Sequence, residues 1–130
     1  MSEFKSRHTI LVVEDDFSTY KALVTKLVQE SYIVLSAKNG LEGLDQALRN
    51  HPDIILLDIV MPGMDGLTML KKLREEGAWG KNVPVILLSN LEPDNKINAS
   101  IVRDEPAYYV VKANSSIDDL ITKIKERLGR

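Results

Sequence analysis

The chain has 130 residues, no cysteine and a formal net charge of −2 at pH 7. This length suits one domain with a single core, and the lack of cysteine excludes disulfides, thiolate nucleophiles and cysteine-based metal sites. Lysine and arginine are spread along the chain, so direct binding to nucleic acid is not expected. Residues 1–8 form a short polar leader without a signal-peptide core, and no apolar run is long enough to cross a membrane. We expect one cytoplasmic domain over residues 1–130.

Five short apolar segments are predicted to be strands. Most of them are continuously apolar, which is typical of strands buried on both faces, because a half-exposed strand alternates polar and apolar residues. Ile33–Ala37 is the weakest of the five. In chain order the segments are Thr9–Val13, Ile33–Ala37, Ile54–Leu57, Val85–Leu88 and Tyr108–Val111.

Segments with helical periodicity alternate with these strands. The last one has a capping-box pattern, with Ser116 at its start and Asp119 three residues later. Alternating strands and helices imply parallel strands joined by right-handed crossovers. We therefore predict a five-stranded doubly wound α/β sandwich with helices on both faces. The helical segments are Tyr20–Val28, Leu41–Leu48, Leu67–Leu73, a polar fourth one within Leu91–Ala107, and the segment after Ser116, while Gly77–Pro84 is predicted to be a loop.

Polar residues directly follow four of the predicted strands. Parallel strands bring their carboxyl ends to one edge of a sheet, where ligands bind in this class of fold. Glu14-Asp15, Asp58, Ser89 and Lys112 are therefore expected to converge. Two carboxylates about 5 Å apart repel by roughly 3 kcal/mol at an effective dielectric of 20, which predicts a bound cation. Oxygen ligands without histidine or cysteine favour Mg²⁺.

These residue types suit one reaction in particular. A carboxylate beside Mg²⁺, a lysine and a hydroxyl group can attack a phosphoryl group and hold the resulting acyl phosphate. Phosphoryl transfer needs positioning and neutralisation of the charge on the equatorial oxygens. Mg²⁺, Lys112 and the Ser89 hydroxyl can supply both, so Asp58 is the predicted nucleophile.

Four segments resemble the receiver domain of two-component response regulators. The resemblance implies a flavodoxin-like (βα)5 sandwich with strand order 2-1-3-4-5, and a single receiver domain without an output domain. The segments are Ile-Leu-Val-Val-Glu-Asp-Asp at 10–16, Leu-Leu-Asp-Ile-Val-Met-Pro-Gly-Met-Asp-Gly at 56–66, Pro-Val-Ile-Leu-Leu-Ser at 84–89 and Tyr-Val-Val-Lys at 109–112.

The resemblance also implies a role for each residue at the site. Asp58 would be the phosphoacceptor, and Ser89 and Lys112 would hold the phosphoryl group. Tyr109 would move with Ser89 between the two states of a switch. The Mg²⁺ ligands would be Asp15 directly, Glu14 through water, Asp58, and the backbone carbonyl of Val60.

As a receiver domain, the protein would accept its phosphoryl group from a histidine kinase or a phosphotransfer protein. It would then change its binding to a separate effector, and the only reactions it would catalyse are its own phosphorylation and dephosphorylation. The alternative is a phosphorelay shuttle that passes the group to a histidine of another protein. A flavin carrier or a small α/β hydrolase is less consistent with the sequence, because the acids after the first strand would repel a phosphate and no further acid–base residue is evident.

Several positions depart from the family or stay open. Ala113 follows Lys112 where the family usually has proline, and Pro106 stands where it commonly has glycine.

Val60 and Leu91 occupy positions that tune loss of the phosphoryl group in this family. Because their side chains are apolar, they cannot hydrogen-bond an attacking water, which predicts a long-lived phosphorylated state. Trp79 is interpreted as a lid over the core, with a partner contact as the alternative.

Overall fold

A computed structural model of the protein describes residues 7–129. The first six residues of the predicted leader lie outside this range. Five parallel strands form one sheet in the order β2-β1-β3-β4-β5, which confirms the predicted topology. The strands are β1 Thr9–Val13, β2 Ile33–Ala37, β3 Ile54–Asp58, β4 Val85–Ser89 and β5 Tyr108–Val111. The helices are α1 Phe17–Gln29, α2 Gly40–Asn50, α3 Gly66–Arg74, α4 Gly77–Asn82, α5 Asn95–Asp104 and α6 Ile117–Leu128, with a 3-10 turn at Lys112–Asn114.

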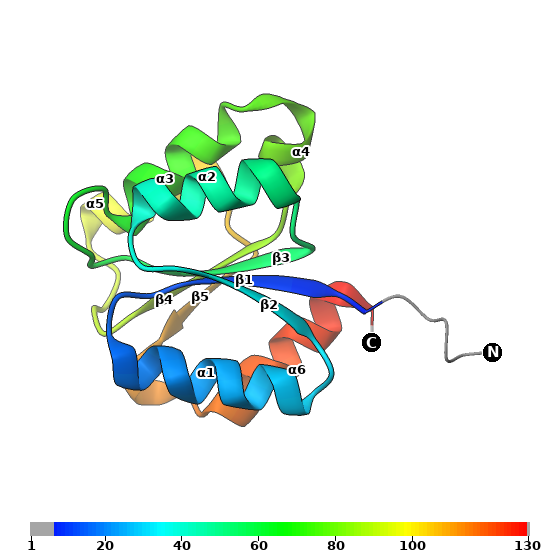
Figure 1. Cartoon of the computed structure of the whole chain (residues 1–130). Helices are drawn as coiled ribbons and strands as arrows, with labels where there is room; N and C mark the ends of the chain where they lie inside the picture. Colours follow the sequence, from blue (N-terminus) through cyan, green and yellow to red (C-terminus); the bar gives the residue numbers. More distant parts are fainter. Residues whose placement is uncertain (1–6, 130) are drawn as a thin grey trace.

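Helices cover both faces of the sheet, with α1 and α6 on one face and the other four on the opposite face (Figure 1). Side chains alternate between the two faces, so each central strand contributes to both halves of the core. On β3, Ile55 and Leu57 pack toward α2 and α3, while Ile54 and Leu56 pack toward α1 and α6. All four side chains are fully buried, as the continuous apolar sequence predicts.

Helix caps place the start of each long helix at the carboxyl edge of the sheet. The Asp16 carboxylate accepts a hydrogen bond from the backbone N–H of Thr19, and Ser116 and Asp119 form the predicted capping box of α6. Each cap accepts from a backbone N–H that has no partner within the helix. The remaining capping side chains are Asn39 for α2, Asp65 for α3 and Asp94 for α5.

The predicted loop at Gly77–Pro84 is wrong, because residues 77–82 form the short helix α4. Two glycines give this segment little helical propensity, and tertiary contacts stabilise it instead. Gly80 lies so close to the Leu73 carbonyl that a Cβ would collide with it. Trp79 packs on the core and stacks on the His51 ring, with centroids 4.1 Å apart. This packing supports the interpretation of Trp79 as a lid.

The polar segment at residues 91–107 contains an ordinary helix, α5. Its amino end is capped by Asp94, and at its carboxyl end the left-handed Glu105 donates its N–H to the Ile101 carbonyl. After β5, the peptide bond between Lys112 and Ala113 is trans, as are all the bonds within residues 7–129. None of the helices in this range is both long and apolar enough to span a membrane.

Candidate functional site

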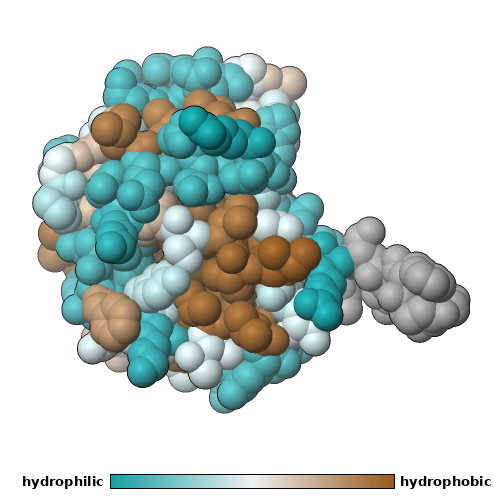
Figure 2. Space-filling model, in the orientation of Figure 1, coloured by the Kyte–Doolittle hydropathy of each residue, from teal (hydrophilic) through white to brown (hydrophobic). Residues whose placement is uncertain are grey.

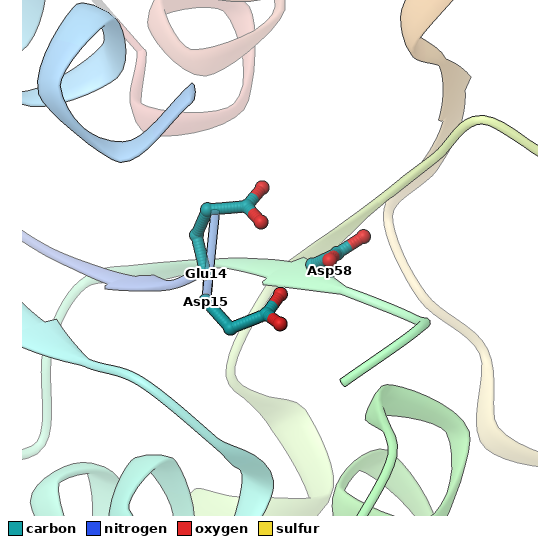
Figure 3. A group of neighbouring side chains, drawn as sticks. All are labelled: Glu14, Asp15 and Asp58. Atoms are coloured by element: carbon teal, nitrogen blue, oxygen red, sulfur yellow. The ribbon is translucent and has the colours of Figure 1, made fainter. Parts of the chain in front are cut away.

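Three carboxylates meet at the carboxyl edge of the sheet. Val13 of β1 pairs in register with Leu57 of β3, so the residues that follow them reach the edge together. Glu14, Asp15 and Asp58 each offer a carboxylate oxygen, and these oxygens lie within 4.8 Å of one another. Figure 3 shows both side chains after β1 pointing toward Asp58. Glu14 and Asp58 are buried, with 3% and 6% of their surface exposed, whereas Asp15 is exposed.

Lys112 extends from the end of β5 to two of these acids. Its Nζ lies 2.9 Å from Glu14 Oε1 and 3.4 Å from Asp58 Oδ1. Burial alone would lower the pKa of Lys112, but the hydrogen bond to Glu14 and the charge of Asp58 outweigh burial, and the pKa is raised. The lysine therefore stays protonated and brings one positive charge to three carboxylates.

One lysine does not neutralise this site. Burial first, and then the charge of Glu14, raises the pKa of Asp58 from 3.8 to about 7, although Lys112 opposes the shift. Without a further cation, Asp58 thus holds a proton over much of the acid range. A divalent cation among the carboxylates would favour the ionised, nucleophilic form.

The donor set fits a hard cation. Each of the three grouped residues offers an oxygen ligand, and within residues 7–129 these acids form the cluster that could hold a metal ion. Mg²⁺ takes one or two protein carboxylates and keeps several waters, and the exposed Asp15 leaves space for them. Val60 lies two residues beyond Asp58 with its side chain exposed, and the role of its backbone carbonyl as a ligand stays a prediction.

Ser89 and Tyr109 meet at the backbone of Leu91. The Ser89 Oγ accepts a hydrogen bond of 2.9 Å from the Leu91 N–H. The Tyr109 hydroxyl donates a 2.8 Å hydrogen bond to the Leu91 carbonyl. Ser89 is fully buried at the end of β4, the strand adjacent to β3. A movement of the Ser89 side chain would therefore shift Leu91, the loop residue whose carbonyl accepts the hydrogen bond from Tyr109.

Gly66 belongs to the site although no role was predicted for it. Its N–H donates to the Ile59 carbonyl at 2.8 Å, and a Cβ at this position would collide with the backbone carbonyl of Asp58. Glycine thus lets α3 begin directly against the backbone of the central acid. The feature of the sequence that could have indicated this role is the position of the glycine immediately after Asp65, the residue that caps α3.

The sequence matches the response regulator receiver domain family over residues 10–125. The chain belongs to this family. Receiver domains are signalling modules of two-component systems, and the family match supports a switch based on a phosphorylated aspartate. PleD, a response regulator of Caulobacter vibrioides, is 43% identical over 83 residues, which cover 64% of this receiver domain and 18% of PleD. The transcriptional regulatory protein YkoG of Bacillus subtilis is 35% identical over 121 residues, covering 92% of this chain and 50% of YkoG.

Solved receiver domains share the fold. A CheY-like receiver domain protein from Methanospirillum hungatei superimposes with a TM-score of 0.86 at 26% identity, over 95% of each chain. The receiver domain of the Francisella response regulator 1452 gives a TM-score of 0.82 at 29% identity, over 95% of this chain and 98% of that one. The chain thus spans half or less of the two curated relatives but nearly the whole of these structures.

Proposed function

We propose that this receiver domain accepts a phosphoryl group on Asp58 and acts as a phosphorylation-dependent signalling switch. The proposal rests on one observation, the convergence of Asp58 with Glu14, Asp15 and the Lys112 ammonium at the edge of the sheet. A buried carboxylate with a cation beside it is suited to attack phosphorus and to stabilise the charge of the product.

The donor would be a phosphohistidine of a histidine kinase or phosphotransfer protein. An Asp58 Oδ would form a bond to phosphorus while the bond from phosphorus to the histidine nitrogen breaks, and the imidazole would leave with the electron pair and take up a proton. Lys112, within 3.4 Å of Asp58 Oδ1, would pair with the transferred oxygens. Glu14, Asp15, Asp58 and the Val60 carbonyl would hold Mg²⁺, which neutralises charge on the phosphoryl oxygens when bound.

Leu91 provides a physical link between phosphorylation and surface change. A phosphoryl group adds about −1.5 to −2 charge and strong acceptor oxygens. The Ser89 hydroxyl would turn from the Leu91 N–H to donate to one of these oxygens. The Leu91 backbone would then lose one of these two hydrogen bonds, and Tyr109, which now donates to the Leu91 carbonyl, would repack. The altered surface would bind an effector protein differently.

Intact-mass measurement after incubation with Mg²⁺ and acetyl phosphate tests the acceptor. Wild type is expected to gain one phosphoryl group and Asp58→Asn none. Asp45→Asn is the matched control, because Asp45 is an exposed acid paired with Arg49 on α2. Incorporation into Asp58→Asn, or none into folded wild type with Mg²⁺, would overturn the proposal.

A phosphorelay shuttle would use the same acceptor and differs only in the fate of the phosphoryl group. In a relay, phosphorylated protein mixed with a histidine phosphotransfer protein would lose its phosphoryl group to that protein. In a switch, the protein would keep the phosphoryl group, and its affinity for the effector would differ from that of the unphosphorylated form. A tenfold change in effector binding requires a difference of about 1.4 kcal/mol between the two states.

A further inference from the structure

We propose that this protein forms a two-fold dimer through the free edge of β2, in which β2 of one copy pairs antiparallel with β2 of a second copy. This inference is independent of the proposed phosphorylation chemistry. It rests on the composition of β2, on the direction of its backbone groups and on the apolar surface around it.

Within residues 7–129, the strand β2 lies at one edge of the sheet and lacks the usual protection of an edge. Its sequence, Ile-Val-Leu-Ser-Ala, contains no charged residue and no proline, the residues that commonly prevent edge-to-edge pairing. Ile33 is 44% exposed, and Val34 and Leu35 are half-buried. The other edge strand, β5, has charged groups of α6 beside it, with Lys123 over the Tyr108 ring and Glu126 accepting from its hydroxyl.

The apolar surface continues beyond the strand. Figure 2 shows a continuous apolar patch on this side of the molecule, over β2 and the adjoining part of α1 in the orientation of Figure 1. Val28 in the last turn of α1 is 57% exposed. Extended apolar patches on soluble proteins commonly mark contact surfaces. The patch therefore supplies apolar side chains for burial beside the strand, on the side of α1.

The backbone of β2 is oriented for a two-fold partner. Ile33 donates its N–H to the His8 carbonyl, and the Ala37 carbonyl accepts from the Glu14 N–H, so residues 33, 35 and 37 face β1. The N–H and C=O groups of Val34 and Ser36 consequently point away from the sheet. In an antiparallel pair centred on Leu35, Val34 of each copy would exchange two hydrogen bonds with Ser36 of the other. These four bonds satisfy every outward group of the two residues. A second copy therefore satisfies the outward hydrogen-bonding groups of β2 and covers its apolar surface at once, as expected of a self-complementary isologous interface.

Sedimentation equilibrium over a protein range of about 1 to 500 μM tests the dimer. Wild type is expected to show a monomer–dimer equilibrium, and Ile33→Lys is expected to weaken association at least tenfold. Val102→Lys is the matched control, because Val102 is 80% exposed on α5, away from β2. A wild type that stays monomeric throughout, or a dimer lost with Val102→Lys and kept with Ile33→Lys, would overturn the proposal.

A cross-link tests the register without relying on the lysine variant. The chain has no cysteine, so Leu35→Cys introduces a single thiol at the residue that lies opposite itself in the proposed pairing. Cβ atoms at such a non-hydrogen-bonded pair lie about 4.5–5.5 Å apart, close to disulfide reach. Mild oxidation should give a covalent dimer with Leu35→Cys and little with Val102→Cys. Equal cross-linking of both variants would contradict the β2 interface.

Discussion

Three consecutive acids after β1 have three different environments. Glu14 is buried and paired with Lys112, and its second carboxylate oxygen accepts a hydrogen bond from the Asp16 N–H. Asp15 is exposed and offers its carboxylate to the group of acids that could hold a metal ion. Asp16 caps α1, and hydrogen bonds from Thr19 lower its pKa. Three neighbouring carboxylates thus contribute to a charge pair, to a cluster that could hold a cation and to a helix cap.

The surface beside the proposed acceptor is apolar at two positions. Val60 and Leu91 are 62% and 45% exposed, and they face a common pocket of about 360 Å³. Neither side chain can orient a water molecule for attack on a phosphoryl group. A long-lived phosphorylated state therefore stays a prediction that these two positions carry.

We expect Leu91→Glu to shorten the lifetime of the phosphorylated protein. A carboxylate at this position could accept a hydrogen bond from an attacking water, and decay should become at least about tenfold faster. The measurement is the loss of the added phosphoryl mass with time after acetyl phosphate is removed. Leu41→Glu, the same change at a residue that is 67% exposed on α2, should decay at the wild-type rate. Unchanged decay in Leu91→Glu would refute the role of this position.

At the scale of elements, Arg74 joins three helices at the amino edge of the sheet. It lies in the last turn of α3, and its guanidinium donates to the carbonyls of Gly80, Val83, Asp104 and Glu105 at 2.7–3.2 Å. These carbonyls belong to the end of α5 and to α4 with the residue after it. Burial lowers the pKa of Arg74, yet its four acceptors keep the charged form stable.

Replacing this arginine should destabilise the fold. Arg74→Ala leaves carbonyls at two helix ends without their charged donor, and we expect the free energy of unfolding to fall by about 2 to 4 kcal/mol. Arg49→Ala removes an exposed arginine that pairs with Asp45 within α2, and it should cost no more than about 0.5 kcal/mol. Urea unfolding followed by circular dichroism measures both. Equal stability of the two variants would show that the Arg74 hydrogen bonds add nothing.

At the scale of the whole molecule, the raised pKa of Asp58 links stability to pH. The folded-state pKa of Asp58 is about 7, against an ordinary value of 3.8 in an unfolded chain, so the folded protein holds this proton more tightly than the unfolded chain does. The stabilisation is complete below about pH 4 and is lost as the pH rises through 7. At about 1.4 kcal/mol per pKa unit, the loss amounts to at most about 4.5 kcal/mol.

Unfolding of wild type and Asp58→Asn without metal should therefore diverge with pH. The free energy of unfolding of the variant minus that of wild type is expected to increase from pH 4 to 7 and to level off above. Adding Mg²⁺ should stabilise wild type more at pH 8 than at pH 5, because the cation competes with the Asp58 proton, and it should have little effect on Asp15→Asn. A pH-independent difference between the two proteins would contradict the raised pKa.

Much of the fold could be predicted from the sequence because its signals are local. Continuous apolar runs such as Ile54–Leu57 indicate strands buried on both faces, and alternation with amphipathic segments fixes a parallel sheet. Each strand then ends on its polar residue, so Glu14, Asp58, Ser89 and Lys112 had to reach a common edge. Short-range pattern and the geometry of parallel strands were sufficient for these conclusions.

The remaining features depend on residues that are distant in the chain. The helix α4 forms despite its glycines because Trp79 packs on the core, and the position of Gly66 against the Asp58 carbonyl follows from the path of α3. The pKa of Asp58 depends on how deeply β3 buries it beside Glu14. The sequence by itself therefore determined which residues form the strands and which polar residues meet at the edge of the sheet. Only the tertiary structure decided their burial and their partners, because those properties arise from contacts between elements and not from any one segment.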